Sequence, residues 1–248
     1  MSAPFLEVDG VRKQYGAIKA VDGVTFKVGP GEIVGVIGPN GSGKTTLFNS
    51  ILGQIKPTSG RVAFCGEDIT GLSPFELSRR GVGRTFQTLQ VFVKLSVRDN
   101  LIAAAQEFKG SLMGRLFAPP DAGLGEQADR MIEMFRLQHV AHLPAGTLSY
   151  GQQKLIDIAM AFMAAPRLVL LDEPCAGVNP SLVDLLRELL VELNRTQGGS
   201  FVVIEHNMDF IMRLCPHVIC MVEGKVLAEG PPETVQSNRQ VLEAYLGN

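Results

Sequence analysis

The segment Gly38-Pro-Asn-Gly-Ser-Gly-Lys44-Thr45 constrains the fold more than any other part of this chain. It fits the pattern GxxxxGK[ST], follows the apolar run EIVGVI and opens the helix-like run TTLFNSIL. In this context, glycines let the backbone N–H groups of the loop surround phosphate oxygens, and the helix dipole attracts the negative charge. Lys44 can reach the β- and γ-phosphates, and the Thr45 hydroxyl can ligate Mg²⁺. The segment therefore predicts an α/β domain that binds a nucleoside triphosphate.

A second motif, LVLLDEP at residues 168–174, places two acids at the end of a predicted buried strand. Sheets of α/β proteins bind their ligands at the carboxyl ends of the strands. Adjacent carboxylates beside a triphosphate would repel one another unless a cation lay between them and the phosphates. We therefore expect Asp172 to hold Mg²⁺, and Glu173 to act as general base or to position the attacking water.

Three further polar or aromatic residues occupy positions where they could serve the same site. Gln87 in GRTFQ follows a predicted strand and could bind Mg²⁺ or the attacking water through its amide. His206 in VVIEHN follows another strand and could donate a hydrogen bond to the γ-phosphate. Each is weak evidence alone, since a lone Gln or His at a strand end is more often a plain loop residue. Tyr15 could stack on a base or simply pack.

The segment LSYGQQK at residues 148–154 allows two interpretations. The Ser149 hydroxyl could cap a helix by accepting hydrogen bonds from its first N–H groups. It could also form half of a phosphate-binding site whose other half lies on another molecule. The local sequence does not distinguish the two.

The order of strand-like and helix-like patterns predicts how the chain is organised. Residues 5–37 alternate short strand-like runs with turn signals, which predicts an antiparallel sheet leading into one buried strand. Residues 44–53 read as a helix that ends at Gly53, and Ser73 caps another short helix. Residues 96–163 are mainly helical and predict a separate lobe. After residue 163, strands and helices alternate as in a parallel sheet.

Composition excludes some functions. With 248 residues, 46% of them hydrophobic, the chain can bury a large core. Its formal net charge of −2 gives no basic field, which argues against non-specific binding to nucleic acid.

Four cysteines bear on the compartment: Cys65, Cys175, Cys215 and Cys220. They form no CxxC pair and no cluster with His, so we expect buried free thiols and a reducing compartment. The N-terminus lacks an apolar signal segment, and apolar runs such as LVLL and FVVI are strand-sized. We expect a cytoplasmic protein with no signal peptide or transmembrane helix, whose membrane role would come from a partner.

Taken in order along the chain, Tyr15, GPNGSGKT, Gln87, LSYGQQ, LVLLDEP and His206 closely resemble the ATP-binding cassette (ABC) ATPase family, over essentially the whole length. In that family two cassettes face head to tail, and each ATP lies between the phosphate loop of one and the signature loop of the other. The resemblance implies a P-loop NTPase core with a mostly parallel sheet, an N-terminal antiparallel β subdomain and an inserted α-helical lobe. Residues 1–248 would form a single ABC ATPase domain, with 1–87 and 164–248 as catalytic core and 88–163 as the helical signature lobe.

The resemblance also implies roles for individual residues. Glu173, His206 and Gln87 would be catalytic, and Thr45, Gln87 and Asp172 would hold Mg²⁺. Ser149, Gly151 and Gln152 would contact the γ-phosphate of ATP bound across the dimer. The residues implied to bind ATP are Tyr15, Gly38, Asn40, Gly41, Ser42, Gly43, Lys44, Thr45 and Thr46.

Two positions depart from the pattern of the family. Tyr150 stands where the usual signature LSGGQ has a glycine, which leaves the contacting positions intact. The loop after the acids, usually SALD, reads Ala176-Gly177-Val178-Asn179, so the usual Asp is Asn179. Because this drops a charge at the expected dimer interface, coupling between the two ATP sites can differ from that of other members.

Within the family, GRTFQTLQVFVKLSVRDNL, AGVNP, GSLMGRLFAPP and the terminal EAYLG resemble the ATPase subunits of branched-chain amino acid importers. This implies ATP hydrolysis coupled to import, with permease subunits and a second ATPase subunit, either another copy of this chain or a sister cassette, as partners. An extracytoplasmic solute-binding protein would be an indirect partner. The chain would then lie peripherally on the cytoplasmic face of the membrane. ATPases for lipopolysaccharide export and for urea or amide uptake are similar and remain alternatives.

Two other classes share part of the motif set. Soluble ABC proteins of DNA repair carry long coiled-coil insertions, and those of translation carry two cassettes in one chain; neither feature is present. A kinase would share GxxxxGK[ST] but has no reason to contain LSYGQQ or His206.

The segment from Leu89 to Phe117 carries apolar residues that could either contact a permease helix or pack the core of the lobe itself. These residues are Val91, Phe92, Leu112, Met113, Leu116 and Phe117.

Overall fold

The apolar runs of the sequence become strands with both faces buried. In the computed structural model, which describes residues 5–85, 89–105 and 122–246, Ile33 and Ile37 of strand β3 (Ile33–Ile37) contribute to one hydrophobic core. Val34 and Val36 of the same strand contribute to a second core on the opposite face. A strand buried on both faces needs apolar residues at successive positions, which explains why these runs do not alternate with polar residues.

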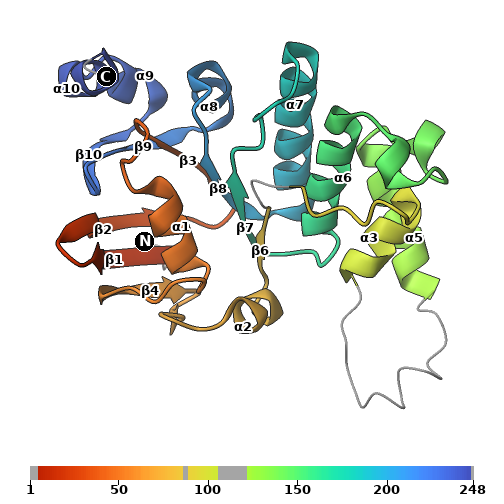
Figure 1. The fold of residues 1–248 in the computed structure, drawn as a ribbon, viewed down its shortest axis with the longest axis horizontal. Helices are drawn as coiled ribbons and strands as arrows, with labels where there is room; N and C mark the ends of the chain where they lie inside the picture. The colour runs from red at the N-terminus through yellow and green to blue at the C-terminus, as the bar shows by residue number, and fades with distance from the viewer. Residues whose placement is uncertain (1–4, 86–88, 106–121, 247–248) are drawn as a thin grey trace.

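The central sheet has six strands in the order β10-β9-β3-β8-β7-β6 (Figure 1). Five of them run parallel, and β10 pairs with β9 in the antiparallel sense. The other strands of this sheet are β6 (Val82–Arg84), β7 (Leu168–Asp172), β8 (Ser200–Ile204), β9 (His217–Val222) and β10 (Lys225–Gly230).

A second, antiparallel sheet has the strand order β2-β1-β4-β5. Its strands are β1 (Leu6–Tyr15), β2 (Ile18–Val28), β4 (Ser59–Phe64) and β5 (Glu67–Asp68). Apolar residues of this sheet share the second core with helix α1 (Lys44–Ile51) and with the central sheet. The predicted antiparallel entry sheet and the mostly parallel main sheet are both confirmed.

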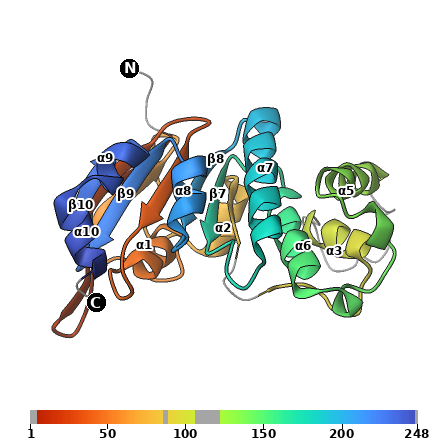
Figure 2. The same ribbon diagram turned by 90° about the horizontal axis from the view of Figure 1, so that it is seen from above.

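Helices cover the other face of the central sheet. Helix α7 (Pro180–Gln197) shows why: Leu186, Leu189, Leu190 and Leu193 recur at helical spacing and are all buried. Helices α6 (Tyr150–Phe162) and α8 (Met208–Leu214) contribute apolar residues to the same core. Figure 2 shows α8, α7 and α6 side by side.

Two helices extend this core away from the sheet. Helices α3 (Val97–Ala105) and α5 (Ala122–Met134) pack with each other and with α6 at one end of the molecule (Figure 2). Two short 3₁₀ turns, Gln138–Val140 and Ala145–Thr147, lead from α5 to α6. The division of the chain at residues 88 and 163 stays a prediction.

Capping and turn residues in the sequence predicted where the short helices begin or end. Helix α2 (Pro74–Arg79) begins with Ser73 as its cap, as expected, and has Pro74 at its first position. Gly53 follows α1 with φ of 66°, which glycine adopts without strain. Strand β10 and helices α9 (Pro232–Gln236) and α10 (Arg239–Leu246) were not predicted from the sequence.

The expectation of buried cysteines is wrong for Cys65. Cys175, Cys215 and Cys220 are buried free thiols, but Cys65 is exposed. It lies in the turn between β4 and β5 with φ of 52°, beside Gly66. A two-residue turn projects from its sheet, so its side chains have no core to enter.

No helix in the described parts of the chain combines the length and apolarity needed to cross a membrane.

Candidate functional site

The phosphate loop joins β3 to α1 and is fitted closely to its neighbours. A Cβ atom on Gly38 would lie 2.1 Å from the Met221 carbonyl oxygen, and one on Gly43 would lie 2.1 Å from the Ala20 carbonyl oxygen. Both glycines also have positive φ, 149° and 98°. Only glycine fits at these two positions, so the backbone itself forms the concave surface of the loop.

The N-terminus of α1 has no side-chain cap, because Gly43 occupies the capping position. By contrast, α2, α6, α7 and α8 each begin with a side chain that accepts a backbone N–H. The first N–H groups of a helix have no partner within it and favour anions. The loop and α1 therefore fit the phosphates of a nucleotide, with Asn40, Gly41, Ser42, Thr45 and Thr46 beside Lys44 along this segment.

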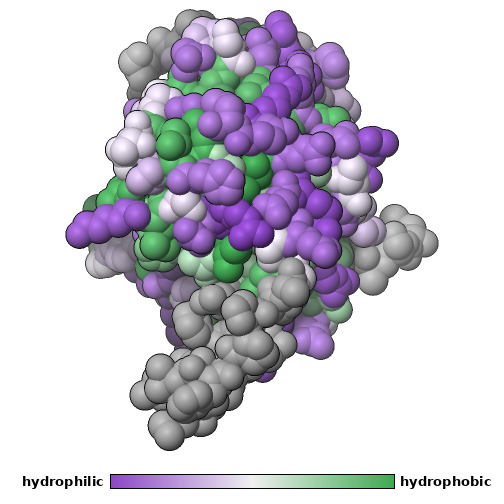
Figure 3. Space-filling view, turned by 90° about the vertical axis from the view of Figure 1, so that its right-hand side faces the viewer, coloured by the Kyte–Doolittle hydropathy of each residue, from purple (hydrophilic) through white to green (hydrophobic). Residues whose placement is uncertain are grey.

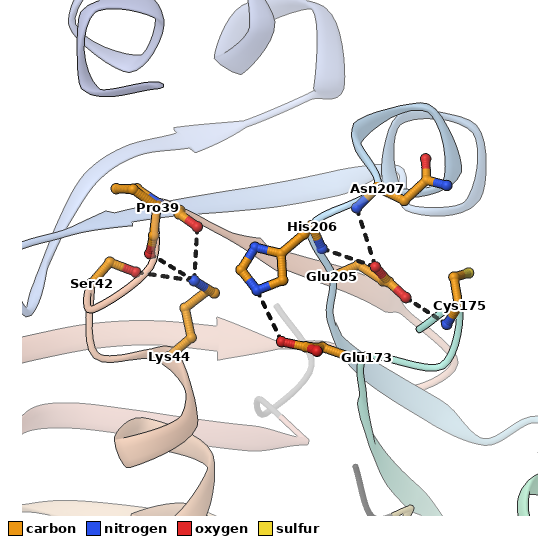
Figure 4. A network of polar contacts seen from close by, with 9 residues as sticks. Pro39, Ser42, Lys44, Glu173, Cys175, Glu205, His206 and Asn207 are labelled. Carbon is orange, nitrogen blue, oxygen red and sulfur yellow. Dashed lines mark hydrogen bonds and ion pairs between the residues drawn. The ribbon is translucent and has the colours of Figure 1, made fainter. Parts of the chain in front are cut away.

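Lys44 lies inside the loop, with 5% of its surface exposed. Its ammonium donates hydrogen bonds to the carbonyl oxygens of Gly38 (2.7 Å) and Pro39 (3.0 Å), and to Ser42 Oγ (3.3 Å), as Figure 4 shows. Burial lowers the pKa of Lys44, while the nearby Glu173, Cys220 and Asp172 act to raise it. A partly desolvated ammonium held at fixed positions attracts an anion more strongly than one in water.

Asp172 ends β7 next to the end of β6. Its backbone N–H donates to Thr85 Oγ1 (3.2 Å), and 6% of its surface is exposed. Burial and then the neighbouring Glu173 raise the pKa of Asp172, while Arg84 and Lys154 oppose the rise. The charged form of the Asp172 carboxylate is therefore disfavoured at this position.

Replacing Asp172 by Asn is expected to raise the melting temperature while lowering Mg²⁺-dependent hydrolysis. Because the pKa of Asp172 is raised in the folded chain, folding loses stability as pH rises towards that pKa, and the full penalty remains above it. At pH 8 we expect a gain of about 2–4 °C, the shift that about 1 kcal/mol gives in a domain of this size. The gain should shrink at acidic pH. Thermal melts of both proteins from pH 4.5 to pH 8 measure it; an equal difference at every pH would contradict it.

The donors at this point suit Mg²⁺. The Thr45 hydroxyl and the Asp172 carboxylate supply oxygen atoms, the ligands that Mg²⁺ prefers. No group of three or more His, Cys, Asp or Glu side chains suited to a metal occurs in the described residues. Mg²⁺ commonly shares its ligands with substrate phosphates and water.

Glu173 and His206 face one another beside the loop. His206 Nε2 and Glu173 Oε1 lie 2.9 Å apart (Figure 4). Glu173 follows β7 with φ of 49°, which is uncommon for a non-glycine residue, and its N–H donates to the Ile204 carbonyl oxygen (2.9 Å). The ends of β7 and β8 therefore bring together an acid and an imidazole that the sequence analysis assigned separately.

Glu205 is a residue of this site that the sequence analysis missed. It is buried and accepts three backbone N–H groups, those of Cys175 (2.6 Å), His206 (2.9 Å) and Asn207 (3.1 Å). It thereby ties the segment after Glu173 to the segment that carries His206 (Figure 4). Its sequence signal was a carboxylate directly after the apolar run FVVI.

Of the two remaining predicted residues, Tyr15 and Gln87, the structure describes only Tyr15. Tyr15 ends β1 with 49% of its surface exposed, beside Lys13, whose ammonium lies 5.0 Å from the ring centre. Tyr15 lies on the hairpin of β1 and β2, which turns at Gly16. Strand β2 of this hairpin contacts the phosphate loop at Ala20. Gln87 lies outside the described residues.

Ser149 caps the N-terminus of helix α6, as the first of its two interpretations predicted. Ser149 Oγ accepts the Gln152 N–H (3.3 Å), and Gln152 Oε1 accepts the Ser149 N–H (3.1 Å), a reciprocal capping box. Helix α6 packs in the main core on one face of the central sheet, whereas α1, which follows the phosphate loop, packs in the second core on the other face. Among the described residues, a Cβ on Gly151 would meet only Leu182 of α7, so this signature residue does not contact the phosphate loop of its own chain.

Tyr150, the first departure from the family pattern, lies against the loop that carries the second, Asn179. A Cβ on Gly177 would lie 3.0 Å from Tyr150 Cε1, and Tyr150 Oη donates to the Ala176 carbonyl oxygen at 3.5 Å. Asn179 caps α7 by accepting the Leu182 N–H (2.9 Å). The tyrosine thus packs on the loop that replaces SALD, and the asparagine retains the role of a helix cap.

Comparison with known families places these features in context. The model for the family described as ABC transporter matches residues 21–176. A second model, described as branched-chain amino acid ATP-binding cassette transporter, matches residues 225–248.

Similar proteins and solved structures agree with these two family matches. The chain is 38% identical to the high-affinity branched-chain amino acid transport ATP-binding protein BraF of Pseudomonas aeruginosa, over 100% of this chain and 99% of that protein. It is 37% identical to the corresponding LivG protein of Escherichia coli, with the same coverage. A crystal structure of an ATP-binding cassette in its ADP conformation superposes with a TM-score of 0.89 at 36% identity, covering all of both chains. Another cassette, 26% identical with a TM-score of 0.77 (92% of this chain, 98% of that one), is dimeric and binds ADP and phosphate. This chain belongs to the ATP-binding cassette family of ABC transporters, as shown by its fold, its uncapped phosphate loop and these full-length similarities.

Proposed function

We propose that this chain is the ATP-hydrolysing subunit of a membrane importer for branched-chain or other hydrophobic amino acids. Hydrolysis is supported chiefly by one observation: the Glu173–His206 pair lies at the strand ends beside the loop that holds Lys44. The solute class is supported by the C-terminal match at residues 225–248 and by the full-length relatives.

In the proposed reaction, the loop and Lys44 bind the β- and γ-phosphates of ATP. Glu173 orients a water molecule and accepts its proton as the oxygen attacks the γ-phosphorus. The bond between that phosphorus and the β,γ-bridging oxygen breaks, leaving ADP and phosphate. His206 donates a hydrogen bond to the γ-phosphate, and its present contact with Glu173 holds both groups in place. Tyr15 stacks on the adenine.

Mg²⁺ would be held by Thr45 and Asp172, together with Gln87, and would neutralise charge on the phosphates. The open sides of the site are completed by a second cassette. Ser149, Gly151 and Gln152 of each chain contact the γ-phosphate bound to the other, with the dipole of α6 adding attraction. ATP binding then favours the closed dimer, and hydrolysis releases it.

A groove on the surface is a candidate site for a permease. It measures about 370 Å³ and is lined by residues of α2, β6, α3 and α6, with apolar Leu52, Ala104 and Met160 among them. Phe75, also in its lining, is 70% exposed. Apolar grooves of this kind suit an amphipathic helix. We propose that a cytoplasmic helix of the permease binds here, which would hold the chain at the inner face of the membrane.

The segment from Leu89 to Phe117 is a second candidate for contact with the permease. Phe92 is 52% exposed, whereas Val91 is half-buried and packs against the main core, the second of the two alternatives for this segment. Leu112, Met113, Leu116 and Phe117 lie outside the described residues. Figure 3 shows hydrophobic surface among hydrophilic side chains at the end of the molecule that holds α3 and α5.

Replacing Phe92 by Ser is expected to weaken retention of the chain by the permease without changing its fold or ATP binding. The side chain is half in solvent, so its loss removes little of the core. Copurification of permease with wild-type and variant chains measures the effect, and Val191→Ser, on an exposed position of α7, is the control. Equal permease recovery with wild type and F92S would exclude Phe92 from the interface.

The function is tested by crosslinking tagged protein in native membranes, purifying it and identifying its partners by mass spectrometry. Two permeases and a second ATPase subunit are expected, with a solute-binding protein joined through the permeases. Recovery of lipopolysaccharide-export components or of permeases for urea would keep the ATPase chemistry but replace the solute. Recovery of soluble proteins alone would overturn the transport role.

A further inference from the structure

The C-terminal helix α10 lies next to the phosphate loop, a neighbour that the proposed mechanism does not use. The two form the walls of a groove of about 290 Å³. Pro39, Asn40, Gly41 and Ser42 line one side of it, and Glu243 and Ala244 of α10 line the other. Figure 2 shows α10 beside β10, at the edge of the central sheet that ends near the loop.

Tyr245, the next residue of α10, packs against the main hydrophobic core. Its hydroxyl oxygen is buried and has no hydrogen-bond partner among the described residues. Burial, with a smaller effect from Cys220, raises the pKa of Tyr245 to about 12. The Gly38 N–H is near enough to oppose that rise, but its geometry falls short of a hydrogen bond to the hydroxyl.

Gly38 is where the loop leaves β3, and it has little freedom to move towards β9. Its Cα hydrogens face the Met221 carbonyl oxygen so closely that even a methyl group would not fit. Tyr245 lies near this same residue, so β9 and α10 together limit where the loop begins. The position of Gly38 in turn sets where the loop carbonyls that bind Lys44 lie.

A buried hydroxyl without a partner is a cost to the fold that phenylalanine would avoid at the same volume. Tyrosine at this position is therefore better explained by a partner gained in another state of the loop than by packing. The loop is the nearby element whose backbone would adjust on binding phosphates, because its glycines permit it.

We propose that Tyr245 is a positioning residue for the phosphate loop, whose hydroxyl accepts the Gly38 N–H when the loop closes around ATP. This rests on the proposed function, since it assumes that the loop binds ATP. It gives the C-terminal segment of the chain a direct part in nucleotide affinity.

The test is calorimetric titration of the full-length chain and of Tyr245→Phe with MgATP, together with thermal melts without nucleotide. The phenylalanine should keep or raise the melting temperature, because it removes the unpartnered hydroxyl. It should weaken ATP binding by about 3- to 10-fold, the effect of losing one hydrogen bond. Leu242→Ala, at an exposed position of the same helix, is the matched control and should change ATP affinity by less than twofold.

Each outcome decides the matter. ATP affinity of Y245F within twofold of wild type would overturn the proposal, as would a lower affinity accompanied by a lower melting temperature, which marks a structural role. If the wild-type chain itself failed to bind ATP, the proposed function would fall, and this result is distinct because it precedes any comparison of variants.

Discussion

Glu173→Gln is expected to lower the rate of ATP hydrolysis about 10³-fold while leaving ATP binding in place. The amide preserves the size of the side chain and its contact with His206 Nε2, now 2.9 Å from a carboxylate oxygen. It cannot accept a proton from the attacking water, so only turnover should suffer. Because ATP binding favours the closed dimer, the variant should also accumulate as a dimer when MgATP is present.

Steady-state phosphate release and size-exclusion chromatography with and without MgATP measure the two effects. Glu126→Gln is the matched control, since Glu126 is exposed on α5 and forms a surface ion pair with Arg130 at 3.7 Å. Hydrolysis by E173Q at the wild-type rate would remove Glu173 from its role. Loss of ATP binding would instead show that the carboxylate maintains the loop.

Lys44→Met is expected to weaken ATP binding by about 10- to 100-fold, the range for a hydrogen bond between charged groups. Methionine retains the apolar stem of the buried side chain but removes the ammonium that now binds Gly38, Pro39 and Ser42. The substitution therefore removes the contact of the ammonium with the phosphates and also the hydrogen bonds that order the loop.

Calorimetry with MgATP measures this effect, and Lys27→Met provides the control. Lys27 is exposed and forms a surface ion pair with Glu7 at 2.7 Å. We expect K27M to bind ATP as wild type does. An unchanged ATP affinity of K44M would contradict the assignment of the phosphate loop.

The sequence predicted the parts of the site that depend on local chemistry. The uncapped α1 and the close glycines 38 and 43 follow from GxxxxGKT between a strand and a helix. Asp172 and Glu173 follow from acids at the end of an apolar strand. In each case the residues that set the conformation also carry the chemistry, so the pattern is readable from a short segment.

Contacts between distant segments were not predictable in the same way. Glu205 joins two loops through three N–H groups, and a single carboxylate after a strand gives no sign of its partners. Tyr245 reaches the phosphate loop only because β10, α9 and α10 return the chain to it. Cys65 was predicted to be buried from its residue type alone. Its position in the turn between β4 and β5 overrode that preference and leaves it exposed.

Ser149 shows a third case, in which one chain carries only part of the answer. Its role as a helix cap is confirmed by the capping box with Gln152. Its role in binding the γ-phosphate of a partner chain stays a prediction, because it depends on a contact between two molecules. The same holds for the effect of Asn179 and Tyr150 on coupling between sites.

The central claim is tested most directly by uptake of labelled leucine into cells that lack this chain. Uptake should be lost in those cells, restored by the wild-type chain and not restored by E173Q, even though E173Q is present in the membranes at equal amount. Unchanged leucine uptake without the chain, or full restoration by E173Q, would contradict the account.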